Sequence, residues 1–376
     1  MASDSVVIAG IGQTAFGKLP GRSVTSLNVE ACRNAVADAG IEKSAIDAVF
    51  AKSITSGHQR FYAQKLAEAL GLQPRMGGTW DQGGASNVTL ISMAADAIKA
   101  GHIEVALIAS ADNPRTGTRS AYSRPLATAD APYGWFGVSA GYAMIAQRHM
   151  RQFGTTSEQL GAIAVACRKH GAANPNAQLR KPITIEDHQA SPWIVEPLHR
   201  DDCCLVSDGA AAVVVMSERK AKELGVSAPV PVLGCGHGQT SWDVALRPDL
   251  TSTSAAVAGA QAFAAAGLTP ADIDVAQIYD CFTITVLMTL EDYGFCAKGE
   301  GGKFVEDGAL EVGGALPLNT SGGLLSETGM PGMQLVLEGV RQMRGTSTTQ
   351  VPGARHVLVS GQGGAMHTHA TMILGQ

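Results

Sequence analysis

The feature that most constrains the fold of this chain is an internal duplication. Residues 35–50 and 263–277 share one pattern, in which an apolar helix ends at a Gly and a short loop, an Ile-Asp pair and a strand follow. Gly40 and Gly267 hold the same place in the two copies, 227 residues apart, and the aspartates of the two Ile-Asp pairs keep the same spacing. Because a repeat of this kind marks two similar structural units, we expect two related halves that pack together.

The surroundings of the two copies extend the repeat. A strand pattern broken by glycines precedes each copy, and a Gly-rich turn, a helix and a further strand follow it. Strands that alternate with helices predict an α/β fold. We expect the helices at 88–100 and 332–344 to pack in one shared buried layer, because both are unusually apolar for their length. The repeated segments are residues 6–12, 83–87, 88–100 and 105–110 in the first half and residues 230–236, 321–323, 332–343 and 356–360 in the second.

The boundary between the halves is expected near residues 220–231. This divides the chain into an N-terminal half, residues 1–225, and a C-terminal half, residues 226–376. Residues 113–205 are rich in Arg, Pro, Asn and His and less periodic, so we interpret them as a long insertion over one face. Helical spacing inside this insertion falls near residues 138–152 and 156–170.

Composition narrows the possible functions. A hydrophobic content of 45% with 44 glycines suits a compact α/β protein with many tight turns. The net charge is −5 and the Lys and Arg residues are spread along the chain, which argues against a nucleic-acid partner. No window approaches 18 uninterrupted apolar residues and no leader pattern opens the chain, so we expect no membrane span.

The cysteines and histidines indicate a reduced protein without a metal site. The seven cysteines are an odd number and are scattered, which fits free thiols in a cytoplasmic protein better than a disulfide framework. No pair of cysteines has metal-ligand spacing. His367 and His369 alternate near the end of the chain, and we interpret them as polar positions of a terminal strand.

A stretch around Tyr279-Asp280-Cys281-Phe282 is the strongest candidate for chemistry. The apolar run at 275–278 predicts a buried strand, and it passes without a Gly or Pro break into helical spacing at 283–290. Open α/β sheets place their chemistry where a strand ends and a helix begins. The alternative is that Tyr279 and Cys281 are ordinary core residues, because buried Cys is common and usually inert.

Several motifs together make the chain resemble the thiolase superfamily. They are the run Ser207-Asp208-Gly209-Ala210, the turn Asn319-Thr320-Ser321-Gly322-Gly323 and the run Gly361-Gln362-Gly363-Gly364, set in the two duplicated halves. Within the superfamily the chain is most similar to the sterol-carrier-protein-type thiolases and to the lipid-transfer-protein-like aldolases of steroid side-chain degradation. The resemblance implies a five-layered αβαβα fold, a homodimer, and action on acyl-coenzyme A thioesters. It implies no cofactor beyond the coenzyme A of the substrate.

The chain departs from the thiolases at their nucleophile. The position of the family's reactive Cys corresponds to Gly84, and no Cys occurs between residues 33 and 166. Ser86 is the nearest hydroxyl, but a Ser nucleophile needs an adjacent base that the sequence does not supply. The family's Gly-His-Pro turn corresponds to Gly329-Met330-Pro331, so Met330 replaces the His. Acyl transfer through an acyl-cysteine is therefore disfavoured.

The residues around Tyr279 resemble those of the steroid aldolases. Sterol-carrier-type thiolases have His-Asp-Cys-Phe there, whereas those aldolases have Tyr first and a following motif matched by residues 290–300. They also use a second Tyr in a later turn, where this chain has Gly329. Retro-aldol cleavage needs a base for the hydroxyl proton and donors for the enolate, but no covalent nucleophile. Tyr279 is the candidate acid or base, and Cys281 is a candidate to share that role.

The remaining candidates surround this group. Asp280 is included with Tyr279 and Cys281 among the catalytic candidates. Backbone N–H groups at Gly84 and near Gly363 and Gly364 are the expected oxyanion donors. The other candidates for substrate binding are Ser86, Gly322, Gly323 and Met330.

Three functions remain open at this point. The first is a carbon–carbon lyase acting on acyl-coenzyme A. The second is an acyltransferase of unusual mechanism, which uses Cys281 or an acyl group passed from a partner. The third is a silent thiolase-like subunit that binds an acyl chain or scaffolds another enzyme.

Two kinds of assembly are also expected. The apolar run at 105–110 carries no charge to protect a free edge, so we predict a homodimer in which this strand is a sheet edge covered by the partner. The resemblance to the thiolases implies that an edge strand of this kind pairs across the two-fold axis. The resemblance to the steroid aldolases implies a small zinc-ribbon and OB-fold partner protein, although a self-sufficient dimer is equally compatible with the sequence.

Overall fold

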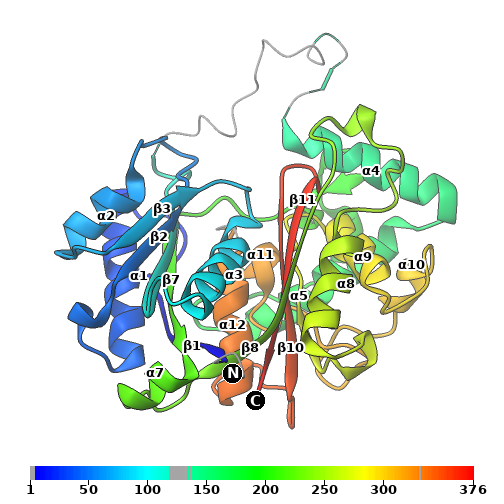
Figure 1. Cartoon of the computed structure of the whole chain (residues 1–376). Coiled ribbons are helices and arrows are strands. Elements are labelled where there is room, and N and C mark those ends of the chain that lie inside the picture. The colour runs from blue at the N-terminus through cyan, green and yellow to red at the C-terminus, as the bar shows by residue number, and fades with distance from the viewer. Residues whose placement is uncertain (1–4, 118–131, 133, 136, 330–331) are drawn as a thin grey trace.

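The computed structural model describes residues 5–117, 132, 134–135, 137–329 and 332–376. Met330 lies outside the described residues. The chain forms five layers, in which two sheets alternate with three layers of helices (Figure 1). The expected αβαβα thiolase-like fold is therefore confirmed.

The first half contains seven strands and seven helices in the described residues. They are β1 (Val6–Gln13), α1 (Val24–Ala39), β2 (Ala48–Lys52), α2 (Tyr62–Leu70), β3 (Met76–Trp80), α3 (Ser86–Lys99), β4 (Val105–Asp112), α4 (Val138–Phe153), α5 (Ser157–Ala173), α6 (Ile185–Ala190), β5 (Trp193–Val195), β6 (Leu198–His199), β7 (Gly209–Ser217) and α7 (Glu218–Glu223).

The second half repeats the plan with fewer additions. Its elements are β8 (Val230–Gln239), α8 (Ala255–Ala266), β9 (Val275–Gln277), α9 (Thr283–Tyr293), α10 (Gly301–Phe304), α11 (Gly323–Ser326), α12 (Met333–Arg344), β10 (His356–Gly363) and β11 (Thr368–Gly375). His369 lies in this terminal strand, as expected, and His367 immediately precedes it.

The strand order shows the duplication directly. The order is β3-β2-β4-β7-β1 in the first half and β8-β11-β10-β9 in the second. If β1, β7, β4 and β2 correspond to β8, β11, β10 and β9, the second order is the reverse of the first. A short antiparallel pairing between β1 and β8 connects the two sheets, through Val7 with Pro231 and Ile8 with Val230. In each half a crossover runs between parallel strands, β2 beside β4 and β9 beside β10. The two halves are therefore related units that face each other.

Glycines in the first strand of each half let a helix pack directly on the backbone. A Cβ atom at Gly12 would overlap the backbone of α1 at Ala31 and Ala35. A Cβ atom at Gly236 would overlap α8 in the same way, at the Ala258 carbonyl. The repeated Gly-punctuated strand pattern thus has one physical cause in both halves, which is close helix–strand contact.

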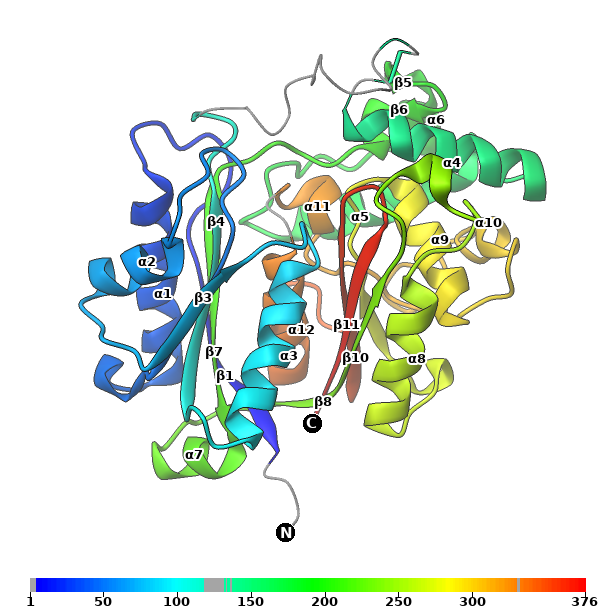
Figure 2. The same ribbon diagram turned by 45° about the horizontal axis from the view of Figure 1, so that its top comes forward.

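The helices α3 and α12 fill the layer between the sheets (Figure 2). Both contact strands of both halves, and most of their residues are buried. α3 is apolar around most of its circumference, as a helix with a sheet on each side requires. α12 is buried as well, but it also carries Gln334, Glu338 and Gln342 inside, where they are hydrogen-bonded. The prediction of a shared central helix layer is confirmed. Within the described part of the chain, no helix has both the length and the apolar character that crossing a membrane requires.

The prediction that residues 105–110 form an edge strand is wrong. These residues belong to β4, which lies between β2 and β7, and all eight of its residues are buried. A strand that has a neighbour on each side and a helix layer on each face is fully buried, so its residues are apolar and uncharged. The absence of charge in this run therefore reflects complete burial.

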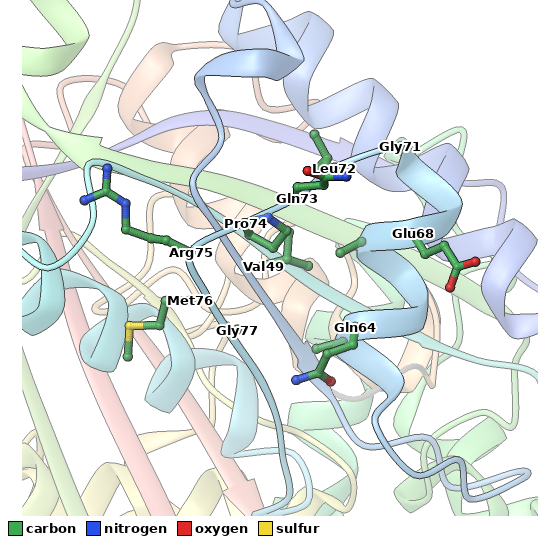
Figure 3. A pocket seen from close by; sticks show the side chains of 12 residues that line it. Val49, Gln64, Glu68, Gly71, Leu72, Gln73, Pro74, Arg75, Met76 and Gly77 are labelled. Atoms are coloured by element: carbon green, nitrogen blue, oxygen red, sulfur yellow. The ribbon is translucent and has the colours of Figure 1, made fainter.

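The outer edge of the first sheet is β3. It pairs with β2, and the Met76 and Trp80 side chains at its ends are 41% and 39% exposed. A hollow of about 650 Å³ lies beside this edge, between β3 and α2, and Figure 3 shows side chains that line it, among them Gln64, Glu68 and Arg75. This surface is separate from the Tyr279 stretch in the sequence and in the fold, because it belongs to the far edge of the first half.

Candidate active site

Tyr279 and Gly84 are in direct contact. Tyr279 follows β9 in the second half, and Gly84 lies in the turn that leads into α3 in the first half. A Cβ atom at Gly84 would overlap ring atoms Cε2 and Cζ of Tyr279. The structure brings these two candidates together, and the Tyr279 ring fills the space that a side chain at residue 84 would need.

Two glycine turns, one from each half, meet beside this contact. A Cβ atom at Gly83 would lie 2.8 Å from Cα of Gly363, and one at Gly361 would lie 2.7 Å from the Gly84 carbonyl oxygen. At Gly363 it would overlap the Gln82 carbonyl. The walls of the site here are therefore backbone, which is the arrangement that supplies N–H donors without side chains.

Ser86 closes the first of these turns. Its hydroxyl donates to the Gly83 carbonyl at 2.8 Å and accepts the Gln82 N–H at 2.8 Å. The residue is fully buried at the start of α3. Because both hydrogen-bonding roles of the hydroxyl are used inside the turn, Ser86 acts as a structural residue in this arrangement.

The chain before Tyr279 is held by the Asn-Thr-Ser-Gly-Gly turn. The Asn319 side chain accepts the Ile278 N–H and donates to the Ile278 carbonyl, both at 2.8 Å. The Tyr279 N–H donates to Ser360 Oγ at 3.0 Å, and its carbonyl accepts from Thr285 at 2.8 Å. These bonds fix the backbone on both sides, so the direction of the Tyr279 ring is set by buried groups.

Asp280 points away from Tyr279 into the protein. Its carboxylate accepts the N–H groups of Leu324 at 2.8 Å and Leu325 at 3.2 Å, at the start of α11. Burial raises the pKa of Asp280 to about 6, against the opposing effect of these N–H donors. A Cβ atom at Gly323 would overlap this carboxylate, and one at Gly322 would lie 2.7 Å from Cα of Gly171 in α5. Asp280, Gly322 and Gly323 thus form one packed unit that positions α11.

Cys281 belongs to a buried polar cluster with Tyr142 and Gln362. Gln362 Nε2 lies 2.8 Å from Cys281 Sγ and 2.7 Å from the Tyr142 hydroxyl. That hydroxyl donates to the Gly364 carbonyl, and the Tyr142 ring stacks on Phe282 with ring centroids 4.3 Å apart. Burial raises the pKa of the Cys281 thiol well above its usual value, so the reactive thiolate is disfavoured at neutral pH.

Tyr142 is a site residue that the sequence did not reveal. It comes from α4 in the insertion and is 220 residues from Gln362. Burial also raises its pKa well above the usual value, so its hydroxyl remains a donor. In the sequence, Tyr142 is a single aromatic residue in a helix of mixed composition, and such a residue by itself indicates only packing.

The turn after α11 excludes a second side chain at the aldolase Tyr position. A Cβ atom at Gly329 would overlap the Leu205 carbonyl oxygen. Three residues later, a Cβ atom at Gly332 would lie 2.8 Å from the Gly84 carbonyl oxygen and 3.5 Å from Tyr279 Cε2. This turn therefore reaches the Tyr279–Gly84 contact through its backbone.

No metal centre is visible in the described residues. They contain no group of three or more His, Cys, Asp or Glu side chains arranged to hold a metal ion. All seven cysteines are free thiols.

Glu327, at the end of α11, provides a pH-dependent test of this packing. Its buried carboxylate accepts from Ser321 at 2.6 Å and from Asn174 at 3.2 Å, and burial raises its pKa to about 7. A carboxyl whose pKa is raised in the folded state is more protonated there than in the unfolded chain. The stability it contributes is therefore lost as the pH rises from about 4.3, its unfolded value, to about 7.

We expect Glu327→Gln to remove this loss, because Gln carries no charge. Denaturant unfolding at about pH 5 and about pH 8 should show that the variant gains about 2 to 4 kcal/mol relative to wild type between the two conditions. Glu42→Gln, at an exposed position, is the matched control and should show no such gain. An equal stability difference at both pH values would contradict the prediction.

The comparisons with known proteins agree with this geometry. Residues 6–219 match the thiolase N-terminal domain family, and residues 236–376 match the thiolase C-terminal domain-like family. The chain is 41% identical to the 17-hydroxy-3-oxo-4-pregnene-20-carboxyl-CoA lyase of Mycobacterium tuberculosis, over 96% of this chain and 97% of that protein. It is 40% identical to the steroid side-chain-cleaving aldolase of Thermomonospora curvata, over 95% of this chain and 94% of the relative.

A solved structure gives the same relationship. The Ltp2-ChsH2(DUF35) aldolase superposes with a TM-score of 0.90 and 38% identity, over 99% of this chain and 97% of that one. Both halves are thus matched, and the relatives extend over nearly the whole length. The chain belongs to the thiolase superfamily, on the branch that contains the steroid side-chain-cleaving aldolases.

Proposed function

We propose that this protein is a carbon–carbon lyase that cleaves 3-hydroxyacyl-coenzyme A thioesters by a retro-aldol reaction, without a covalent acyl-cysteine. The observation that carries the proposal is the packing of the Tyr279 ring into the space above Gly84. The nucleophilic Cys of the superfamily would occupy this space. Tyr279 therefore leaves no room for that Cys, and it places a hydroxyl group there instead. The names of the two relatives at about 40% identity support the same reaction class.

The reaction requires only proton transfer and charge stabilisation. In its phenolate form, the Tyr279 oxygen takes the proton of the 3-hydroxyl group as the C2–C3 bond breaks, and the phenol that forms is the source of the proton for C2. The electron pair of that bond passes to the thioester, which becomes an enolate, while C3 becomes a carbonyl. A proton returned to C2 completes the acyl-coenzyme A product, so there is no net oxidation or reduction. The backbone of the glycine turns at 83–84 and 363–364 is the proposed source of donors for the enolate oxygen.

Cys281 is assigned a supporting role in this scheme. Its buried thiol keeps its proton at neutral pH and lies beside Gln362 and Tyr142. It therefore stays a protonated thiol that accepts a hydrogen bond from Gln362, and it is disfavoured as a nucleophile. This argues against an acyltransferase built on Cys281, which is the second candidate function, and a silent acyl-binding subunit is the third.

Tyr279→Phe tests the lyase directly. The change keeps the ring against Gly84 and removes only the proton-transfer group, so we expect kcat to fall by roughly 10² to 10⁴ with little change in KM. The assay follows cleavage of 17-hydroxy-3-oxo-4-pregnene-20-carboxyl-CoA, the compound named for the M. tuberculosis relative, by chromatography. Tyr62→Phe is the matched control, because Tyr62 is also buried but bonds to Asn28 in the outer layer.

Two further measurements separate the alternatives. Mass spectrometry of the protein during turnover should find no acyl group on any cysteine, and Cys281→Ala should retain more activity than Tyr279→Phe. An acyl-cysteine, or a larger loss in Cys281→Ala, would move the protein to the acyltransferase class. If the protein binds the thioester tightly but does not convert it, whether or not free coenzyme A is present, the protein is a silent subunit.

We further propose that the protein is a homodimer formed through β3. This strand offers an unpaired edge flanked by the exposed Met76 and Trp80 side chains. Charged residues on such an edge oppose pairing. The variant Met76→Asp/Trp80→Asp should therefore be a folded monomer by light scattering at micromolar concentration, whereas wild type should be a dimer.

A matched control uses the same chemistry elsewhere on the surface. Met144 and Trp193, in the insertion, are 48% and 51% exposed, and Met144→Asp/Trp193→Asp should leave the dimer intact. A monomeric wild-type protein, or a dimer unaffected by the β3 substitutions, would rule out this interface.

The proposed partner is a small zinc-ribbon and OB-fold protein. The support is the similarity to the Ltp2-ChsH2(DUF35) aldolase. We expect the chain alone to turn over slowly and co-purification with such a partner to raise kcat. Full turnover by the chain purified alone would remove the need for it. The cytoplasmic location expected from the reduced cysteines stays a prediction.

A further inference from the structure

Three buried polar atoms beside the Tyr142 cluster lack hydrogen-bond partners among the described residues. They are Oε1 of Gln362, Nδ1 of His367 and Nη2 of Arg247. Buried polar groups are normally paired, so each of these atoms is a position where a ligand can supply the missing partner. Gln362 already contacts Tyr142 and Cys281, which places the inner end of this group at the candidate active site.

Arg247 is the charged member of the group. Arg247 is buried, with a relative exposure of 8%. Its Nε donates a long hydrogen bond of 3.4 Å to the Ser241 carbonyl. None of the ion pairs in the described part of the chain includes Arg247. A buried guanidinium without a counter-ion is costly, and an anionic ligand would offset that cost.

The position of Arg247 connects the site with the surface. Burial lowers the pKa of Arg247, and the Tyr142 hydroxyl opposes this effect. Burial together with the charge of Arg247 lowers the pKa of His367 to about 4, so that His367 is neutral. The His367 ring packs against Gly364, whose carbonyl accepts from Tyr142. On its other side His367 meets Trp242, with ring centroids 4.3 Å apart, and Trp242 is 78% exposed.

The loop that carries Arg247 also lines a hollow. Ala245 and Leu250 of this loop face Ala143 and Met144 of α4 across about 780 Å³. The rim holds Arg148 and Arg151 together with Glu196 and Asp243, so its charges balance. The hollow therefore offers apolar room beside the loop that carries Arg247, and the buried guanidinium of Arg247 has no ion-pair partner among the described residues.

We propose that Arg247 binds a negatively charged oxygen of the thioester substrate. The planar guanidinium suits a carboxylate or phosphate, because it donates two parallel N–H bonds to either group. The oxygen has two possible sources, which are a carboxylate on the acyl part and a phosphate of coenzyme A. This inference rests on the proposal that the site takes acyl-coenzyme A thioesters, and it names an anchor for them.

Calorimetric binding of four unreactive thioesters tests the inference and separates the two sources. The probes are glutaryl-coenzyme A, which carries a carboxylate, pentanoyl-coenzyme A, which does not, and the two corresponding pantetheine thioesters, which lack the phosphates. The variants are Arg247→Met, which removes the charge, and Arg247→Lys, which keeps it. Arg33→Met, at an exposed position of α1 in the outer helix layer, is the control.

A carboxylate anchor predicts that wild type prefers each glutaryl thioester over its pentanoyl counterpart by about tenfold or more, and that Arg247→Met loses this preference. A phosphate anchor predicts that Arg247→Met weakens both coenzyme A thioesters by about tenfold or more and leaves both pantetheine thioesters unchanged. In either case Arg247→Lys should retain part of the effect, and Arg33→Met should bind as wild type does.

Unchanged affinity for all four thioesters in Arg247→Met would overturn the inference. So would an equal loss for all four together with a lower melting temperature, because that result indicates a structural role. These measurements involve no turnover. Retained activity in Tyr279→Phe would therefore contradict the lyase without touching the Arg247 result, and the reverse also holds.

Discussion

The contact between the Tyr279 ring and the Gly84 backbone is the constraint on which the rest of the site depends. It joins the end of a second-half strand to the start of a first-half helix, and neighbouring glycines at 83, 361 and 363 bring the two turns equally close. A side chain at any of these positions would push the halves apart. The site therefore exists only when both duplicated units are packed against each other, and the central helices α3 and α12 hold that arrangement.

The site is built mainly from groups that are neutral at physiological pH. Burial keeps the Tyr142 hydroxyl and the Cys281 thiol protonated, and it makes His367 a neutral imidazole. Neutral donors in a low-dielectric environment interact strongly with a charge that develops during reaction, because little water screens it. Such an environment suits an enolate intermediate better than it suits a thiolate nucleophile.

Much of the fold could be predicted from the sequence because it is encoded in repeated local patterns. The spacing of glycines and apolar residues identified the two halves, the central helices and the strand before Tyr279. The strand at 105–110 was misplaced because uncharged composition reports burial and does not tell an edge from a centre. Asp280, Ser86, Gly322 and Gly323 were candidates for the site, but their contacts show that they shape turns. Tyr142 and Arg247 were missed because their relevant neighbours, Gln362 and His367, are more than a hundred residues away, and no periodicity signals such a contact.

The overlap between the Tyr279 ring and any side chain at residue 84 also couples substitutions at these two positions. A Cys introduced at 84 while Tyr279 is present would have no room, and a smaller residue at 279 while Gly84 is present would leave a gap. Each single replacement therefore costs packing, so an engineered exchange at one of the two positions needs a compensating exchange at the other.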